Sequence, residues 1–199
     1  MSLSLTKIVM ATSNAGKIKE ISELLKGLKI EVIAQSEYSV TDAVENGKSF
    51  QENSLIKARH AAKVTGLPSI ADDSGLTVDA LNGKPGVHSA RYAGKHGDDS
   101  ANNIKLLNAL EDIDDRAATF HCVATFVNAD HKPLIAEGLW SGEILHELNG
   151  EGGFGYDPLF FIPECGCSSA ELSVQKKNIL SHRGKALRRL VDLIKKKYT

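Results

Sequence analysis

The stretch Lys7-Ile8-Val9-Met10-Ala11-Thr12-Ser13-Asn14-Ala15-Gly16-Lys17 decides the fold class of this chain of 199 residues. Its first part, Lys7 to Thr12, has the apolar character and the length of a buried strand. Ser13 and Asn14 supply side-chain oxygens that cap a helix N-terminus. Apolar residues then recur at helical spacing, at Ile18, Ile21, Leu24, Leu25 and Leu28. A strand, a loop and a helix in this order predict an α/β fold.

Helix and strand patterns alternate along the rest of the chain. Further strands are expected at Glu31 to Ala34 and Ser69 to Ala71, and an antiparallel pair at Ala117 to Ala129 and Pro133 to Leu145. Further helices are expected at Phe50 to Thr65, at Asp99 to Leu110 and from near Ser181 onward. Ser36 to Lys48 and Gly83 to Gly97 have the composition of loops. A chain of this length holds one generous core or two small lobes.

Composition excludes several classes of partner. Lys and Arg total 24 against 25 Asp and Glu, so no global basic field points to nucleic acid. The basic run Lys195 to Lys197 falls at the end of the last predicted helix, where cations complement the helix dipole. No apolar run approaches the ~20 residues that span a bilayer, and the first residues contain no secretory apolar region. We expect a cytoplasmic protein without a nucleic-acid or membrane partner.

The three cysteines, Cys122, Cys165 and Cys167, are odd in number. None lies in a C-x-x-C pair or near a histidine at zinc spacing. We therefore expect reduced, structural thiols.

The segment Asn14-Ala15-Gly16-Lys17 has part of the chemistry of a phosphate-binding loop. Backbone amides at a helix N-terminus and a nearby lysine form an anion site. The G-x-x-x-x-G-K-[ST] pattern fails at two positions, because Ala11 stands where its first glycine belongs and Ile18 where its Ser or Thr belongs. Thr12, Lys17 and the backbone amides still suit a polyphosphate, whereas simple helix capping explains the same residues about equally well.

Two adjacent carboxylates, Asp72 and Asp73, follow the predicted strand Ser69 to Ala71. Strand ends carry the ligand crevice of open α/β sheets, and neighbouring side chains on a strand point to opposite faces. At most one of the two is therefore expected to face a ligand. Ser74-Gly75 predicts an immediate turn that exposes this carboxylate, and an Asx turn without a catalytic role explains the residues equally well.

Two further acids, Glu45 and Glu52, lie near the start of a predicted helix. Ser49-x-x-Glu52 ahead of the helix forms a capping box, which satisfies N-terminal amides without any catalytic role. A metal-ligand role for Glu52 competes with that explanation. Because Mg²⁺ is usually held by one or two carboxylates together with waters and substrate phosphates, two or three converging acids would suffice.

Two C-terminal segments have the composition of a site for a flat polar ring. Gly152-Gly153-Phe154-Gly155-Tyr156-Asp157-Pro158 combines backbone freedom, an aromatic stacking face and a carboxylate acceptor. A turn between two strands is the simpler explanation of this stretch. Ser181-His182-Arg183-Gly184-Lys185 places cations in the first turn of a helix, against the preference of the helix dipole. An anion or a polar ligand would relieve that mismatch.

Six blocks, spread in one order over nearly the whole chain, resemble the inosine triphosphate pyrophosphatases of the bacterial type, which hydrolyse noncanonical purine nucleoside triphosphates. The blocks are Ala11 to Lys17, Phe50 to Ala58, Ala71 to Leu76, Pro85 to Tyr92, Gly152 to Pro158 and Ser181 to Gly184. The resemblance implies one domain over residues 1–199, with an elongated α/β fold of two lobes, a long central mixed sheet flanked by helices, and a cleft between the lobes. It also implies a homodimer and a Mg²⁺ cofactor.

The resemblance implies roles for several acids. Asp73 would be the catalytic residue, as the proton acceptor for the attacking water, and also a ligand of Mg²⁺. Glu52 would be a second carboxylate on the metal side. Glu45 and Asp72 would assist them.

The resemblance also implies a set of substrate-binding residues. They are Thr12, Ser13, Asn14, Ala15, Gly16, Lys17, Ser74, Phe154, Gly155, Tyr156, Asp157, Lys177, His182 and Arg183. The segment Thr12 to Lys17 would hold the triphosphate and Phe154 would stack on the purine, while the residues after Phe154 would close around its polar edge. Lys57 and Arg91 would add positive charge on the phosphate side.

The expected reaction converts ITP, dITP or XTP to the nucleoside monophosphate and pyrophosphate. Donors from His182 or Arg183 would select a 6-oxo group, because a 6-amino group would leave them unpaired at a cost of about 1–3 kcal/mol each. A nucleotide sensor without turnover is an alternative that needs no base at Asp73. A pyrophosphatase for modified pyrimidine nucleotides, as in the septum-formation-inhibitor group, fits the segment around Phe154 less well. An RNA-binding protein fits the near-neutral charge poorly.

Overall fold

The computed structural model describes residues 5–12, 15–26, 30–129 and 131–198. The predicted binding residues Ser13 and Asn14, and the predicted helical position Leu28, lie outside the described residues. The chain forms two compact units. Unit 1 comprises Met1–Asp73, Cys122–Gly138 and Arg183–Thr199, and unit 2 comprises Ser74–His121 and Leu139–His182. Neither unit is a continuous stretch of chain.

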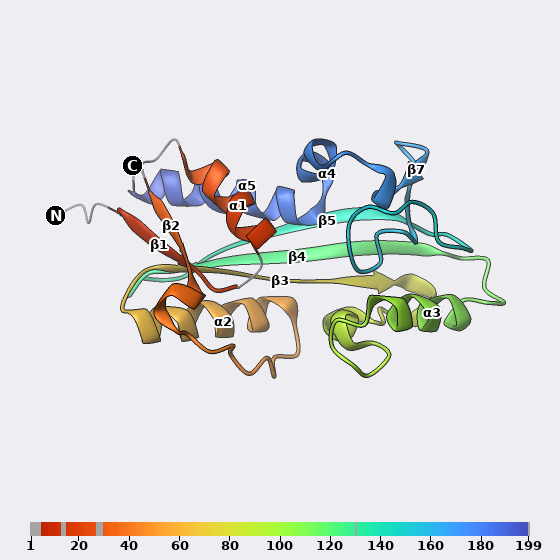
Figure 1. The fold of residues 1–199 in the computed structure, drawn as a ribbon, viewed down its shortest axis with the longest axis horizontal. Helices are drawn as coiled ribbons and strands as arrows, with labels where there is room; N and C mark the ends of the chain where they lie inside the picture. Colours follow the sequence, from red (N-terminus) through yellow and green to blue (C-terminus); the bar gives the residue numbers. More distant parts are fainter. Residues whose placement is uncertain (1–4, 13–14, 27–29, 130, 199) are drawn as a thin grey trace. The chain divides into compact units, whose positions relative to one another are not determined.

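The elements alternate as the sequence predicts (Figure 1). The strands are β1 (Lys7–Met10), β2 (Glu31–Ala34), β3 (Ser69–Val78), β4 (Ala117–Val127), β5 (Leu134–Ile144), β6 (Phe160–Ile162) and β7 (Cys167–Ser168). The helices are α1 (Ala15–Leu25), α2 (Phe50–Thr65), α3 (Asp99–Ala109), α4 (Val174–Leu180) and α5 (His182–Tyr198). The strands form one open sheet in the order β2-β1-β3-β4-β5-β6-β7. Pairing is parallel at β1–β2 and β1–β3 and antiparallel at β5–β6 and β6–β7, so the predicted α/β class with a mixed sheet is confirmed.

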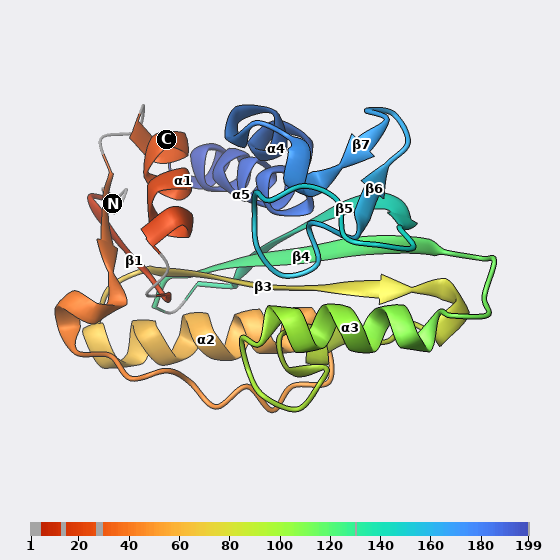
Figure 2. The same cartoon turned by 45° about the vertical axis from the view of Figure 1, so that its right-hand side comes forward.

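In unit 1, helices α1 and α5 cover one face of strand β1 (Figures 1 and 2). Ile8 and Met10 share this face because alternate residues of a strand point to the same side. They belong to one buried cluster with Ile21 of α1 and with a helical stripe of α5. The stripe consists of Leu187, Leu190, Val191 and Ile194. The helix predicted from near Ser181 onward therefore presents one apolar face to the core.

Helix α2 packs on the opposite face of β1 (Figure 2). Val9 of β1 meets alanines of α2 there, and these small side chains allow a close approach. The helix begins where Ser49 Oγ accepts a hydrogen bond from Glu52 N–H at 3.1 Å. It ends at Gly66, whose φ of 69° is left-handed. The predicted bounds, Phe50 to Thr65, are confirmed.

Unit 2 has its own core beside helix α3. The core consists of Leu76, Val78, Leu106, Leu110, Ala118, Phe120, Trp140, Ile144, Tyr156, Leu159, Phe160 and Ile162. The ring of Phe160 lies 4.6 Å from that of Phe120 and 5.3 Å from that of Trp140, measured between centroids. Large aromatic side chains thus supply much of the buried apolar area of this unit.

Strand β3 continues past the position where the sequence predicts a turn. The expected strand Ser69 to Ala71 extends to Val78, through Ser74 and Gly75. Leu76 and Val78 are fully buried. Burial of these alternate apolar side chains outweighs the turn preference of Ser-Gly. The predicted turn at Ser74-Gly75 is therefore wrong, and the two carboxylates before it lie within a strand.

The C-terminal region contains two helices where the sequence predicts one. Ser173 Oγ caps α4 by accepting a hydrogen bond from Lys176 N–H at 3.3 Å. Ser181 ends this helix, and α5 begins at His182. The seven residues of α4 are too few to show a clear helical period in the sequence. In the described ranges, every helix falls short of the length and apolar character that crossing a bilayer requires.

Candidate active site

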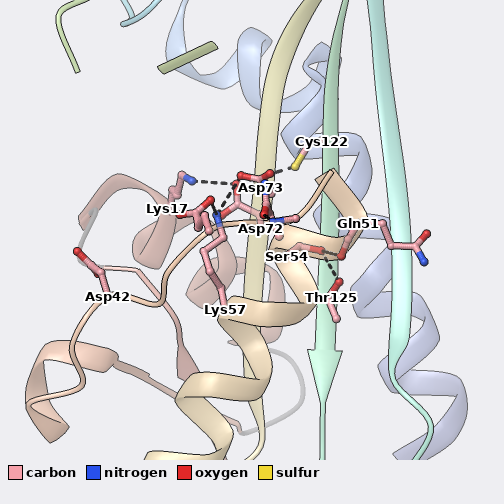
Figure 3. A network of polar contacts seen from close by, with 12 residues as sticks. Lys17, Asp42, Gln51, Ser54, Lys57, Asp72, Asp73, Cys122 and Thr125 are labelled. Carbon is pink, nitrogen blue, oxygen red and sulfur yellow. Dashed lines mark hydrogen bonds and ion pairs between the residues drawn. The ribbon is translucent and has the colours of Figure 1, made fainter. Parts of the chain in front are cut away.

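Asp72 on strand β3 is the centre of a buried charge cluster in unit 1 (Figure 3). Its Oδ2 atom accepts hydrogen bonds from Lys17 Nζ at 2.9 Å and from Arg183 Nε at 3.3 Å. Cys122 Sγ lies 4.0 Å from the same oxygen. The cluster therefore joins the first turns of α1 and α5 to the sheet.

Burial and neighbouring cations act in opposite directions on the Asp72 carboxyl. Burial raises its pKa, whereas Lys17, Arg183 and Lys57 lower it; the cations prevail, and the pKa lies well below the usual range. Asp72 therefore keeps its negative charge at neutral pH. For the Cys122 thiol, burial and then the charge of Asp72 raise the pKa. Asp72 is thus a counter-ion that orients two cations.

Asp73 points to the other face of the sheet, toward helix α2. Lys57 Nζ donates a hydrogen bond to Asp73 Oδ1 at 3.0 Å (Figure 3). It also donates to Glu45 Oε2 at 3.0 Å. The different partners of the two adjacent aspartates confirm that they face opposite sides of the strand. Lys57 brings Glu45, from the loop before α2, into one cluster with Asp73.

The two members of the Lys57–Asp73 pair influence each other's pKa. Burial raises the pKa of Asp73, while the charge and hydrogen bond of Lys57 lower it, and the net result is a raised pKa. Burial lowers the pKa of Lys57, but the carboxylates of Asp73, Asp72 and Glu45 together outweigh burial and raise it. Lys57 is therefore cationic at neutral pH. A carboxylate with a raised pKa accepts a proton more readily, as a general base must.

The described residues of the predicted phosphate segment, Thr12 and Ala15 to Lys17, lie shortly after β1 and in the first turn of α1. Thr12 is half-buried, and Ala15 is the first residue of the helix. The ammonium group of Lys17 is tied to Asp72 in the first turn. First-turn amides and a fixed cation are both features that suit a phosphate group.

Glu52 forms one bond of the predicted capping box, while its side chain accepts from Lys48 N–H and not from the N–H of the cap residue Ser49. Ser49 Oγ accepts from Glu52 N–H at 3.1 Å, and Glu52 Oε2 accepts from Lys48 N–H at 2.6 Å. In the described part of the chain, no three His, Cys, Asp or Glu side chains converge closely enough to hold a metal by themselves. Asp73 and Glu45 share one ammonium group, so their carboxylates do converge. These two suit Mg²⁺, which takes one or two protein carboxylates plus water and phosphate.

In unit 2, the buried carboxylate of Asp157 fixes the predicted aromatic loop. Its Oδ2 atom accepts from Phe154 N–H at 2.7 Å and contacts Lys177 Nζ, while its Oδ1 atom accepts from Ser169 Oγ at 2.9 Å. A Cβ atom at Gly153 would meet Asp157 Oδ2 at 2.2 Å. Asp157, which the family resemblance places at the substrate, is engaged here in holding the loop and the lysine.

The two aromatic residues of this loop lie in different surroundings. Phe154 is 57% exposed, and Lys177 Nζ lies 5.1 Å from the centroid of its ring. Tyr156 is buried and donates its hydroxyl to Ser89 C=O at 2.9 Å. Burial raises the pKa of Tyr156, so its phenol stays neutral. Phe154 is therefore the aromatic side chain that a ligand ring can reach.

His182 and Arg183 begin α5 and have separate surroundings. The His182 ring is stacked in unit 2, with its centroid 4.7 Å from Phe120 at 8° and 6.4 Å from Trp140 at 25°. This stack fixes the plane of the imidazole. Arg183 belongs to the charge cluster of unit 1. Ser74, half-buried on β3, is the first residue of unit 2.

The predicted site residues thus gather in two groups. Unit 1 contains Thr12, Lys17, Glu45, Glu52, Lys57, Asp72, Asp73 and Arg183, and unit 2 contains Ser74, Phe154, Gly155, Tyr156, Asp157, Lys177 and His182. Three further residues were not predicted from the sequence. Asp99 and Asn103 of α3 bond Gly155 from 56 and 52 residues away along the chain, and Ser169 bonds Asp157. No local pattern marks these three residues, because their partners are set by tertiary contacts.

The described residues form an α/β protein with an open mixed sheet, a buried charge cluster in unit 1 and an exposed aromatic ring, that of Phe154, in unit 2. A family model described as the Ham1 family matches residues 8–193. The chain belongs to the Ham1 family. The resemblance inferred from six blocks of sequence is thereby confirmed.

Relatives match over almost their whole length. The dITP/XTP pyrophosphatase of Vibrio cholerae is 52% identical over 197 residues, which cover 97% of this chain and 98% of the relative. The protein of the same name from Thioalkalivibrio sulfidiphilus is 56% identical over 190 residues, or 94% of this chain and 97% of the relative. The solved structure of a HAM1 protein from Coxiella burnetii aligns with a TM-score of 0.92 at 51% identity, covering 96% of this chain and 99% of that one. The Staphylococcus aureus Ham1 protein aligns at 0.90 and 42% identity, with the same coverage.

Proposed function

We propose that this protein hydrolyses noncanonical purine nucleoside triphosphates, namely dITP, ITP and XTP, to the nucleoside monophosphate and pyrophosphate. Such a reaction removes deaminated purines from the nucleotide pool. Relatives at 52% and 56% identity carry the name dITP/XTP pyrophosphatase. Support from the structure comes above all from Asp73, a partly buried carboxylate with a raised pKa that is hydrogen-bonded to Lys57. That environment suits a general base acting on water.

In the proposed reaction, Asp73 takes a proton from a water molecule while the water oxygen attacks the α-phosphorus. The bond from the α-phosphorus to the oxygen bridging to the β-phosphorus breaks, and pyrophosphate leaves with that electron pair. One water is consumed for each triphosphate. Lys17 and Lys57 offset the charge that develops on the phosphate oxygens, and preorganised cations do this without reorganisation at the moment of reaction. Asp72 holds Lys17 in place.

For the base, we propose that Phe154 stacks on the purine with Lys177 beside it. His182 and Arg183 donate to the 6-oxo group. The rigid stacking of His182 supports this role, because a fixed donor discriminates better than a mobile one. A purine with a 6-amino group would leave these donors unpaired, at about 1–3 kcal/mol each, or roughly tenfold to hundredfold in kcat/KM.

The remaining predicted contacts stay part of this proposal. They are Thr12, Ser13, Asn14, Ala15, Gly16, Ser74, Gly155, Tyr156 and Asp157. Thr12 lies shortly after β1, and Ala15 and Gly16 begin α1, where a triphosphate would meet first-turn amides.

For the cofactor, we propose Mg²⁺ held by Asp73 and a second carboxylate, Glu52 or Glu45. The bound ion would neutralise phosphate charge. Glu45 shares Lys57 with Asp73, whereas one Glu52 oxygen serves the helix cap. We therefore expect Glu45→Gln to raise the half-saturating Mg²⁺ concentration more than Glu52→Gln does. The opposite ranking would assign the second ligand to Glu52.

We further propose a single domain over residues 1–199 that acts as a cytoplasmic homodimer, without a nucleic-acid or membrane partner. The match to relatives over 97% of this chain and 98% of the relative supports one functional domain. Sedimentation equilibrium over a range of concentrations tests the dimer. A mass that stays at one chain at all concentrations would exclude it.

Product analysis tests the reaction directly. The enzyme is incubated with Mg²⁺ and a panel of ITP, XTP, dITP, GTP and ATP, and phosphate release is followed with and without added inorganic pyrophosphatase. We expect phosphate only when the auxiliary enzyme is present, and mainly from ITP, XTP and dITP. Phosphate release without the auxiliary enzyme would indicate a phosphohydrolase. ATP cleavage as fast as ITP cleavage would contradict the proposed selectivity, and nucleotide binding without turnover would indicate a sensor.

A further inference from the structure

Helix α3 holds the backbone of the aromatic loop at two points. The Gly155 N–H donates to Asp99 Oδ2 at 2.7 Å, and Asn103 Nδ2 donates to the Gly155 C=O at 3.0 Å. Asp99 and Asn103 are four residues apart on the helix, so their side chains share one face. Both polar backbone groups of a single loop residue are therefore tied to one rigid element.

Asn103 is a polar side chain at a buried position of α3, and only one end of its amide has a hydrogen-bond partner among the described residues. Asn103 is only 6% exposed, and its Oδ1 atom has no hydrogen-bond partner among the described residues. A buried polar atom without a partner destabilises a fold, and an apolar side chain would fit a buried helix position better. The amide orientation follows from the Gly155 carbonyl, which requires a donor. The contact with Gly155 is thus the feature of this side chain that an apolar residue could not supply.

We call the two hydrogen bonds from Asp99 and Asn103 to Gly155 the clamp, and the residue before Gly155 is Phe154. Its ring is 57% exposed, so the ring direction depends on how firmly its backbone is held. Asp157 Oδ2 accepts from the Phe154 N–H at 2.7 Å, and the two α3 side chains hold the following peptide. A loop that is already ordered loses less conformational entropy when a ligand stacks on it.

We propose that Asp99 and Asn103 are positioning residues that hold Phe154 in the orientation for stacking on the substrate base. This inference rests on the proposed function for its substrate. The clamp itself does not depend on that function. Asp99 and Asn103 contact Gly155 and contribute to substrate binding only through Phe154.

The variants Asp99→Ala, Asp99→Asn and Asn103→Ala test the clamp, with the exposed Asn108→Ala on the same helix as the control. The Asn108→Ala substitution removes a side-chain amide from α3 at an exposed position that does not contact the loop. Asp99→Asn keeps an acceptor oxygen but loses the charge, so it separates the hydrogen bond from the favourable effect of an acid at a helix N-terminus. Steady-state ITP kinetics, thermal unfolding and amide hydrogen exchange at Gly155 are measured for each.

We expect both alanine variants to raise the KM for ITP by about three- to tenfold with kcat changed by less than about twofold. Asp99→Ala should also speed exchange of the Gly155 amide, and Asp99→Asn should restore most of the wild-type KM. Asn103→Ala should change the unfolding temperature little, because the lost bond to the Gly155 C=O and the removal of an Oδ1 atom without a partner act in opposite directions. A general structural role would lower the unfolding temperature and would not separate KM from kcat.

A double-mutant cycle with Phe154→Ala gives the sharpest test. If the clamp acts through the ring, Asp99→Ala should raise KM in the wild type but not in the Phe154→Ala background. Equal effects in both backgrounds would overturn the proposal, as would unchanged KM in Asp99→Ala despite faster exchange at Gly155. A wild-type protein without ITP turnover would refute the proposed function, whereas unchanged exchange in Asp99→Ala would refute the clamp, so the two failures are distinguishable.

Discussion

Lys57 Nζ lies 3.0 Å from Asp73 Oδ1, and the same ammonium group lies 3.0 Å from Glu45 Oε2. Lys57 is therefore the charge that allows two carboxylates to converge. We expect Lys57→Met to lower kcat/KM for ITP by about tenfold to hundredfold, because the variant loses the ammonium group that holds the Asp73 carboxylate and offsets charge on the phosphate oxygens. Steady-state kinetics at saturating Mg²⁺ measure the change.

Lys63→Met is the matched control for this prediction, because Lys63 is an exposed lysine in the last turn of the same helix. Its kcat/KM should stay within about twofold of the wild type. An unchanged kcat/KM in Lys57→Met would show that the cation has no part in the reaction.

The second prediction concerns the proposed base. Asp73→Asn should lower kcat by about 10²- to 10⁴-fold, because an amide cannot accept the proton of the attacking water. Binding of ITP, measured by calorimetry, should be retained. Asp79→Asn, the same substitution at an exposed aspartate, is the control and should leave kcat unchanged. Turnover above about a tenth of the wild-type value in Asp73→Asn would place the base elsewhere.

The third prediction concerns the counter-ion Asp72. Asp72→Asn should lower the free energy of unfolding by about 1–3 kcal/mol, because it leaves the cations of Lys17 and Arg183 beside a buried neutral group. Urea unfolding measures the loss. Asp114→Asn, at an exposed position, should leave the stability within about 0.5 kcal/mol of the wild type. Equal free energies of unfolding in the two variants would contradict the role of Asp72 as a counter-ion.

The fourth prediction compares two glycines of the aromatic loop. Gly153 and Gly155 both have positive φ, 78° and 63°, and alanine costs about 1 kcal/mol at either position for that reason. A Cβ at Gly153 would also meet Asp157 Oδ2 at 2.2 Å, whereas a Cβ at Gly155 would meet nothing within 4 Å. Gly153→Ala should therefore raise the KM for ITP and lower the unfolding temperature clearly more than Gly155→Ala. Equal effects would show that Asp157 does not fix the loop.

The fifth prediction concerns thiol reactivity. Cys122 is fully buried, and burial together with the charge of Asp72 raises its pKa, so its thiolate form is suppressed. Cys165 and Cys167 are partly exposed. An alkylating reagent should label these two in the native protein, because their side chains are partly accessible. Cys122 should be labelled only after unfolding. Mass spectrometry counts the modified residues.

Much of the fold followed from local sequence. The bounds of α2 were predictable because Ser49 caps one end and Gly66 the other, and both act on their immediate neighbours. The strands β1 and β2 followed from local apolar patterns. The turn predicted at Ser74-Gly75 failed because pairing and burial in the sheet extend β3 beyond its local preference.

The sequence by itself determined the α/β class, the family, the chemical types at the candidate site and the opposite directions of Asp72 and Asp73, because each depends on spacing along the chain. Only the tertiary structure decided the partners: Lys57 between Asp73 and Glu45, Asp72 as the counter-ion of Lys17 and Arg183, and α3 as the clamp on Gly155. Hydrogen bonds and ion pairs act over a few ångströms in space. Groups that lie from 12 to 111 residues apart in sequence therefore acquire their partners only when the chain folds.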